Sequence, residues 1–143
     1  MNKEDINALD EIHKGTCMGM DAIKYTLDKV EDEKLKNVLN KQYEGYSDIA
    51  KRIEEIYPSY NGGEPHSTNV MNKAMTWYGI EMKTLTDTSN SKIAELLLNG
   101  VNMGIIEGKK ILNKKKIDSQ VSSIVSDYVS MQEDSVEVLK TYL

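Results

Sequence analysis

The sequence predicts an all-α protein, an antiparallel four-helix bundle with one additional short helix. Apolar residues recur at alternating steps of three and four over long stretches, as on the buried face of a bundled helix. The only two prolines lie in one short segment, so every other stretch is free to be helical. A chain of 143 residues is long enough for one hydrophobic core. We therefore expect residues 1–143 to form a single helical domain.

The first helix is expected over about residues 4–31 and contains an unexpected polar residue on its apolar face. That face is formed by Ile6, Leu9, His13, Thr16, Met20, Ile23, Leu27 and Val30. His13 and Thr16 are its only polar members and lie near its middle. A buried imidazole needs a hydrogen-bond partner or a ligand. His13 is therefore the first candidate site residue.

The second helix is expected over about residues 33–57, because the apolar pattern restarts at Leu35 after the acidic segment 31–33. This segment predicts a tight turn, and its carboxylates suit the positive N-terminus of the following helix. The two helices then form an antiparallel hairpin. Both prolines and two adjacent glycines lie within residues 57–66, which predicts a loop.

Three further helices are expected over about residues 68–86, 89–113 and 117–142. A single bent helix over 68–113 is the alternative for the first two of these. At about 69 Å it would extend beyond neighbours of about 37 Å, so we favour the break. The short helix then serves as a crossover between two hairpins.

This length, helix order and crossover resemble the ferritin-like superfamily, and most closely its small bacterial members without an assigned activity. The resemblance implies a ferritin-like fold. The family's di-iron site would need a Glu-x-x-His motif, yet no glutamate here is followed by histidine three residues later. The nearest match is Asp10-x-x-His13, so the resemblance does not extend to ferroxidase or oxygenase chemistry.

Counting residues along the expected helices places His13 and Glu107 at the same level of the bundle. We expect the two side chains to form a hydrogen-bonded pair, with Asp10 nearby, that fixes the register of the helices. The functional alternative is an atypical iron or manganese site made by the same three residues. A copper site is a further alternative, because Cys17 and Met20 share a helix face with His13.

Small residues form two rows on the expected helices. Gly100, Gly104 and Gly108 are spaced by four on the apolar face of the helix over 89–113. A second row on the first helix consists of Ala8, Gly15, Gly19 and Ala22. The glycine row predicts close packing of two helices, and the row on the first helix predicts a contact with the helix over 68–86 or with a second subunit. For both rows the alternative is space for a flat or elongated ligand.

Charge and composition narrow the class of function. The net charge of −5 argues against a general binder of nucleic acid or anionic membranes. Cys17 is the only cysteine, and the first residues do not form a signal peptide, so a cytoplasmic location is expected.

We therefore expect a non-catalytic intracellular bundle, without a cofactor, that acts by forming a homodimer or by binding a protein partner. Two alternatives stay open. One is a transition-metal redox or storage bundle centred on His13 and Glu107. The other is a binder of a small apolar ligand beside Gly100, Gly104 and Gly108, with Met103 in the wall of its pocket.

Overall fold

A computed structural model describes residues 3–62, 65, 86–114 and 116–143. These residues contain four α-helices and no strand, so the predicted all-α class is confirmed for this part of the chain. The helices are α1 (Lys3–Leu27), α2 (Glu33–Asn61), α4 (Asn90–Leu112) and α5 (Ser119–Lys140). The short helix predicted over 68–86 lies outside the described residues, except for residue 86, which is not helical.

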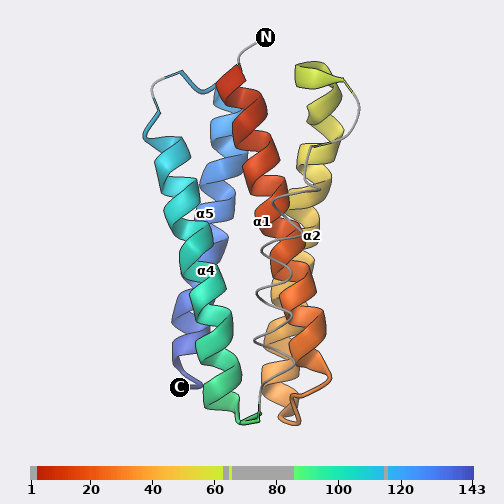
Figure 1. The fold of residues 1–143 in the computed structure, drawn as a ribbon, viewed down its shortest axis with the longest axis vertical. Helices are drawn as coiled ribbons and strands as arrows, with labels where there is room; N and C mark the ends of the chain where they lie inside the picture. The colour runs from red at the N-terminus through yellow and green to blue at the C-terminus, as the bar shows by residue number, and fades with distance from the viewer. Residues whose placement is uncertain (1–2, 63–64, 66–85, 115) are drawn as a thin grey trace.

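The four helices lie side by side in two hairpins (Figure 1). In that view α1 runs downward from the N-terminus and α2 returns upward. The second hairpin consists of α4, which runs upward, and α5, which descends to the C-terminus. Between the hairpins, α1 packs against α4 and α2 packs against α5. The core therefore lies between the four helices, and α1 also contacts α5 across it.

A single carboxylate links the starts of α2 and α4. Asp32 is the N-cap of α2, and its Oδ1 accepts a hydrogen bond from the backbone N–H of Leu35 at 3.0 Å. Its Oδ2 accepts one from the Asn90 side chain at 3.2 Å. The backbone hydrogen bond, more than any other contact, lowers the pKa of Asp32. The acidic turn predicted at 31–33 thus also positions the second hairpin.

Two helix ends differ from the prediction. The first helix ends at Leu27 instead of 31, because a tight turn follows in which Val30 donates to the carbonyl of Leu27 and is buried. The second helix continues to Asn61 through Pro58, which was predicted to lie in a loop. The fixed φ of proline suits a helix, and this exposed last turn tolerates the missing N–H. The helix ends at Gly62, whose φ of 43° favours glycine.

Residues 86–89 are not helical, and α4 begins immediately after them. Ser89 is the N-cap of α4, and its hydroxyl accepts a hydrogen bond from the backbone N–H of Lys92 at 3.2 Å. A serine in this position satisfies an otherwise unpaired helix donor. The alternative of a continuous helix over 68–113 is therefore wrong.

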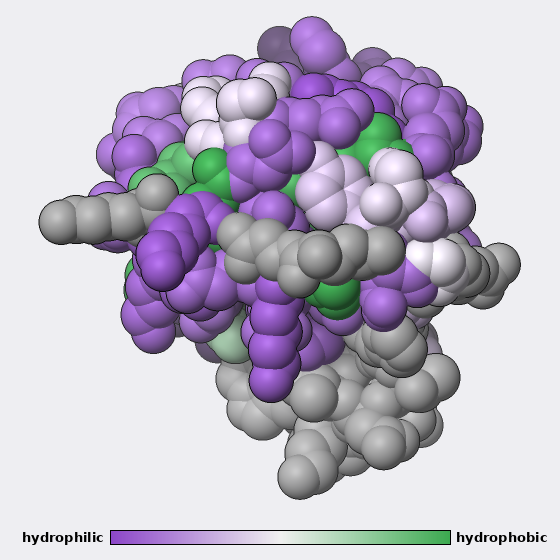
Figure 2. All heavy atoms as spheres, turned by 90° about the horizontal axis from the view of Figure 1, so that it is seen from above, coloured by the Kyte–Doolittle hydropathy of each residue, from purple (hydrophilic) through white to green (hydrophobic). Residues whose placement is uncertain are grey.

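Polar contacts join three chain segments at the upper end of the bundle. The buried Asp5 of α1 accepts a hydrogen bond from the backbone N–H of Asp118 at 2.8 Å. The Tyr60 hydroxyl of α2 donates to the Asp118 carboxylate. Burial, followed by this carboxylate, raises the pKa of Tyr60 to about 12. Seen from this end, the coloured surface is mainly hydrophilic (Figure 2).

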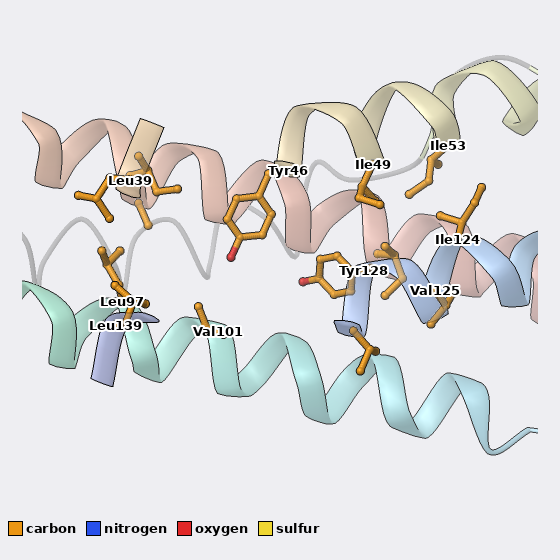
Figure 3. Close-up of a cluster of buried hydrophobic side chains, with 14 of the residues drawn as sticks. Leu39, Tyr46, Ile49, Ile53, Leu97, Val101, Ile124, Val125, Tyr128 and Leu139 are labelled. Atoms are coloured by element: carbon orange, nitrogen blue, oxygen red, sulfur yellow. The ribbon is translucent and has the colours of Figure 1, made fainter. Parts of the chain in front are cut away.

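Apolar side chains from all four helices fill the interior, and buried tyrosines lie among them, of which Figure 3 labels Tyr46 and Tyr128. Tyr46 comes from α2 and Tyr128 from α5, and both are at least 95% buried. Tyr46 packs directly against α1: a Cβ atom built on Gly19 would lie 2.5 Å from its ring. The second small-residue row thus serves close packing at Gly19, and the occupant is an aromatic ring.

We predict that Gly19→Ala destabilises the protein by about 1–3 kcal/mol, because its methyl group would collide with a ring that cannot move. This loss outweighs the gain of about 1 kcal/mol in helix propensity. Urea unfolding followed by circular dichroism measures the difference.

Gly45→Ala is the matched control. A Cβ atom there would lie 2.7 Å from the sulfur of Met131, a flexible and only partly buried side chain. We expect this variant to be neutral or more stable. Equal destabilisation by both substitutions would contradict the explanation.

Candidate functional site

His13 lies on the side of α1 that faces α2. Its side chain is 10% exposed, and Nε2 is 3.1 Å from Oε1 of Glu54 on α2. On the other side of the ring, Nδ1 is 3.9 Å from the sulfur of Cys17, one turn further along α1. The imidazole therefore has a partner at each nitrogen and connects the two helices of the first hairpin.

The predicted pairing of His13 with Glu107 is wrong. Glu107 lies on α4, its side chain is about half exposed, and its carboxylate is 3.9 Å from the ammonium group of Lys110. Counting residues gives the level of a side chain along the bundle but not the direction in which it points. The rotation of α1 about its axis turns His13 toward α2 and away from α4.

The three candidate metal ligands are not brought together. Asp10 is half-buried on α1, and His13 and Glu107 have the separate partners described above. Of the proposed copper ligands, Cys17 meets His13, whereas Met20 packs against the hydrophobic core. Within the described part of the chain, no group of three or more His, Cys, Asp and Glu side chains is arranged to hold a metal ion.

A cavity of about 220 Å³ lies between α1 and α4. Its walls include Gly15, Met18 and Gly19 of α1 and Gly100, Met103 and Gly104 of α4. Side chains of α2 and α5 also line it, namely Gln42, Tyr46, Tyr128 and Gln132. The two rows of small residues found in the sequence therefore face the same space.

Tyr46, Gln132 and Tyr128 of this lining form a buried hydrogen-bonded chain. The Tyr46 hydroxyl donates to Oε1 of Gln132 at 2.7 Å, and Nε2 of Gln132 donates to the Tyr128 hydroxyl at 3.1 Å. Gln132 is 1% exposed. Buried hydroxyl and amide groups need such partners, since an unpaired one costs about 1–3 kcal/mol. Figure 3 shows that the two tyrosine rings extend into the same part of the interior.

Glycine is required where the side chains of this hydrogen-bonded chain approach α1 and α4. A Cβ atom on Gly15 would lie 2.6 Å from the Tyr128 hydroxyl oxygen. One on Gly104 would lie 2.5 Å from Nε2 of Gln132. Gly108 has a different role, because it is not among the residues that line the cavity. A Cβ atom on Gly108 would lie 2.3 Å from the side chain of Val129 on α5, so this glycine allows Val129 to pack against α4. The glycine row of α4 thus serves both packing and the cavity.

Charged side chains lie around the cavity in ion pairs. The ammonium group of Lys14 is 2.9 Å from the Glu11 carboxylate, and Lys110 is near Glu107. Lys14 lines the cavity although only 10% of its side chain is exposed. Because each lysine has a carboxylate nearby, the charges at the cavity balance. The ionisable residues of the described lining are Glu11, Lys14, Glu107 and two tyrosines.

Several of these residues were not identified from the sequence as parts of a site. Tyr46 and Tyr128 appear there only as members of apolar helix faces, and Gln132 and Glu54 carry no recognisable motif. One signal was available: the chain has glycines at helical spacing and no phenylalanine, so any aromatic ring packed on them is a tyrosine or tryptophan. Which tyrosine meets which glycine depends on how the hairpins pack.

None of the helices in the described part of the chain combines the length and apolar character needed to cross a membrane. Comparison of the chain with known protein families, curated proteins and solved structures found no match.

The contacts of His13 predict a dependence of stability on pH. Burial opposes protonation of the ring, but the hydrogen bonds to Cys17 and Glu54 outweigh it and raise the pKa of His13 above 6.5. The folded protein therefore binds a proton more tightly than the unfolded chain does. The resulting stabilisation is complete at pH values below the pKa of His13 in the unfolded chain. It is lost as the pH rises through the higher pKa that His13 has in the folded protein.

We expect Glu54→Gln to destabilise the protein by up to about 1 kcal/mol at about pH 6, because the carboxylate is half exposed. The effect should be smaller at about pH 8.5, where a smaller fraction of the ring is protonated. Urea unfolding at both pH values measures it, with the exposed neighbour Glu55→Gln as the control. A loss for Glu54→Gln that is equal at both pH values would refute this role of the pair.

Proposed function

We propose that this protein is a non-catalytic binding protein that holds a small, mainly apolar molecule in the cavity between α1 and α4. The observation that carries this proposal is the cavity itself, lined by Gly100, Gly104 and Met103. Its volume of about 220 Å³ exceeds the roughly 150 Å³ of an apolar protein cavity known to bind benzene. A molecule with one ring and a short substituent has a suitable size.

The lining favours an apolar ligand bound without chemistry. Aromatic and aliphatic groups, with exposed backbone at the glycines, form most of the wall. Binding sites for small molecules are typically apolar with a few polar groups that fix orientation. The balanced charges of Lys14 and Glu11 provide no field that would select a strongly charged molecule.

We also propose a ferritin-like arrangement for the bundle. Its support is the direction of the helices in Figure 1, where α2 and α4 run the same way. Two hairpins joined by one long crossover give this arrangement. The metal chemistry of that superfamily is not part of the proposal, since Asp10, His13 and Glu107 do not gather into a metal-binding group.

Titration with isopropylbenzene, followed by the backbone amide signals in NMR, tests the proposed function. We expect saturable shifts confined to residues near the cavity, with a dissociation constant of about 1 mM or tighter. Met103→Trp should weaken binding at least about tenfold, because Met103 is 51% exposed in the wall and a larger side chain there fills the entrance.

Asn102→Trp is the matched control, because Asn102 is the exposed neighbour of Met103 and does not line the cavity. It should bind isopropylbenzene like the native protein. Shifts spread over the whole surface, or no saturation up to the solubility limit, would contradict the proposed function.

Self-association is a second candidate function, favoured by two exposed apolar residues on α4. Met103 is 51% exposed and Ile106, one turn further, is 54% exposed. Apolar side chains that adjoin on a helix surface favour contact with another protein surface. The homodimer expected from the sequence would use this part of α4.

Light scattering at micromolar concentration tests self-association. We expect the mass of a dimer for the native chain and the mass of a monomer for Ile106→Glu, because a charge placed in an apolar contact is costly to bury. Lys110→Glu is the control for a change of charge one turn away. A monomeric mass for the native protein would exclude a stable dimer.

A further inference from the structure

The side chain of Gln132 is a buried polar group that lines the cavity, and it is the more buried of the two lining glutamines. Only 1% of the residue is exposed, and it lies on α5 between the two tyrosines. A glutamine side chain offers two N–H donors and two acceptor positions on its oxygen. The Tyr128 hydroxyl receives one N–H, and the Tyr46 hydroxyl occupies one acceptor position. One N–H and one acceptor position have no hydrogen bond within the described part of the chain.

The nitrogen of this amide lies at the wall formed by α4. Nε2 would be only 2.5 Å from a Cβ atom on Gly104, and Gly104 lines the cavity. The absence of a side chain at Gly104 therefore allows Nε2 to reach the space between α1 and α4. A donor buried in this way gains from any acceptor that enters beside it.

Charge at this depth is disfavoured. Leu97 and Val101 line the same cavity and are at least 95% buried, so the surroundings of the amide are apolar. An ionised ligand group would lose its hydration there and gain only an amide dipole in exchange. The ammonium group of Lys14 is already paired with Glu11. A neutral oxygen loses far less hydration free energy than an ionised group when it enters the cavity.

We propose that the ligand carries an uncharged acceptor oxygen, as in a small ketone, aldehyde or quinone, which accepts a hydrogen bond from Nε2 of Gln132. This inference rests on the proposed function and specifies its ligand class. The ring or chain of the ligand lies against the tyrosine rings and Met103, and the carbonyl group points toward the amide. Binding is reversible, and no covalent bond forms.

Acetophenone and isopropylbenzene are matched probes, since they share heavy-atom number and branching and differ in a carbonyl oxygen that replaces a methyl group. We expect acetophenone to bind about threefold to tenfold more weakly to Gln132→Met than to the native protein. Isopropylbenzene should change by less than about twofold between the same two proteins. Both affinities come from NMR titration, and circular dichroism checks that the variant is folded.

Tyr46→Phe is the second variant, and it keeps the proposal testable where Gln132→Met does not fold. It removes the hydrogen bond to Oε1 and leaves Nε2 in place. We expect the native protein to bind acetophenone more tightly than isopropylbenzene, and this preference should persist in Tyr46→Phe. In a native sample, nuclear Overhauser contacts should also join the acetophenone methyl group to the side-chain amide of Gln132.

The titrations distinguish failure of the proposed function from failure of the ligand class assigned here. If neither probe binds the native protein, the proposed function fails together with this inference. If isopropylbenzene binds and the affinity for acetophenone does not depend on Gln132, only the inference is overturned. Tighter binding of benzoate than of acetophenone would overturn the assignment of an uncharged oxygen and point to Lys14 instead.

Discussion

The hydrogen-bonded chain of Tyr46, Gln132 and Tyr128 is the constraint on which the centre of this bundle depends. The sequence has no phenylalanine, so a large ring in the core brings a hydroxyl group with it. Tyr46 and Tyr128 satisfy their hydroxyl groups in part through one buried amide, which joins α2 to α5. This contact holds two aromatic side chains in a fixed orientation. The opposing helices must accommodate them, and only glycine leaves enough room.

The cavity follows from this arrangement. Glycines in a helix usually allow a second helix to approach closely. In this bundle, side chains from α2 and α5 enter the space beside the glycines of α1 and α4. The tyrosines occupy part of it, and a volume of about 220 Å³ is left. The ion pair of Lys14 with Glu11 and the buried amide of Gln132 are among the groups that line this space. Close packing and the cavity are therefore two consequences of the same glycine rows.

His13 illustrates why the site was harder to predict than the fold. The periodic pattern identified it correctly as buried. Its partner depends on the rotation of α1 about its own axis, and a difference of one residue in the apolar face changes that direction by about 100°. The ring faces Glu54 of α2, an exposed residue with no periodic signal. The opposite face of α1 consequently borders the cavity.

The sequence by itself determined the helical class, the hairpin turn at Asp32, the start of α4 at Ser89 and the two glycine rows, since each depends on local spacing or capping. It could not specify that Tyr128 covers Gly15, that Gln132 bridges two tyrosines, or that Lys14 is buried beside a cavity. These contacts join residues up to more than a hundred positions apart. They were decided only in the tertiary structure, because the mutual rotation of four packed helices selects which side chains meet.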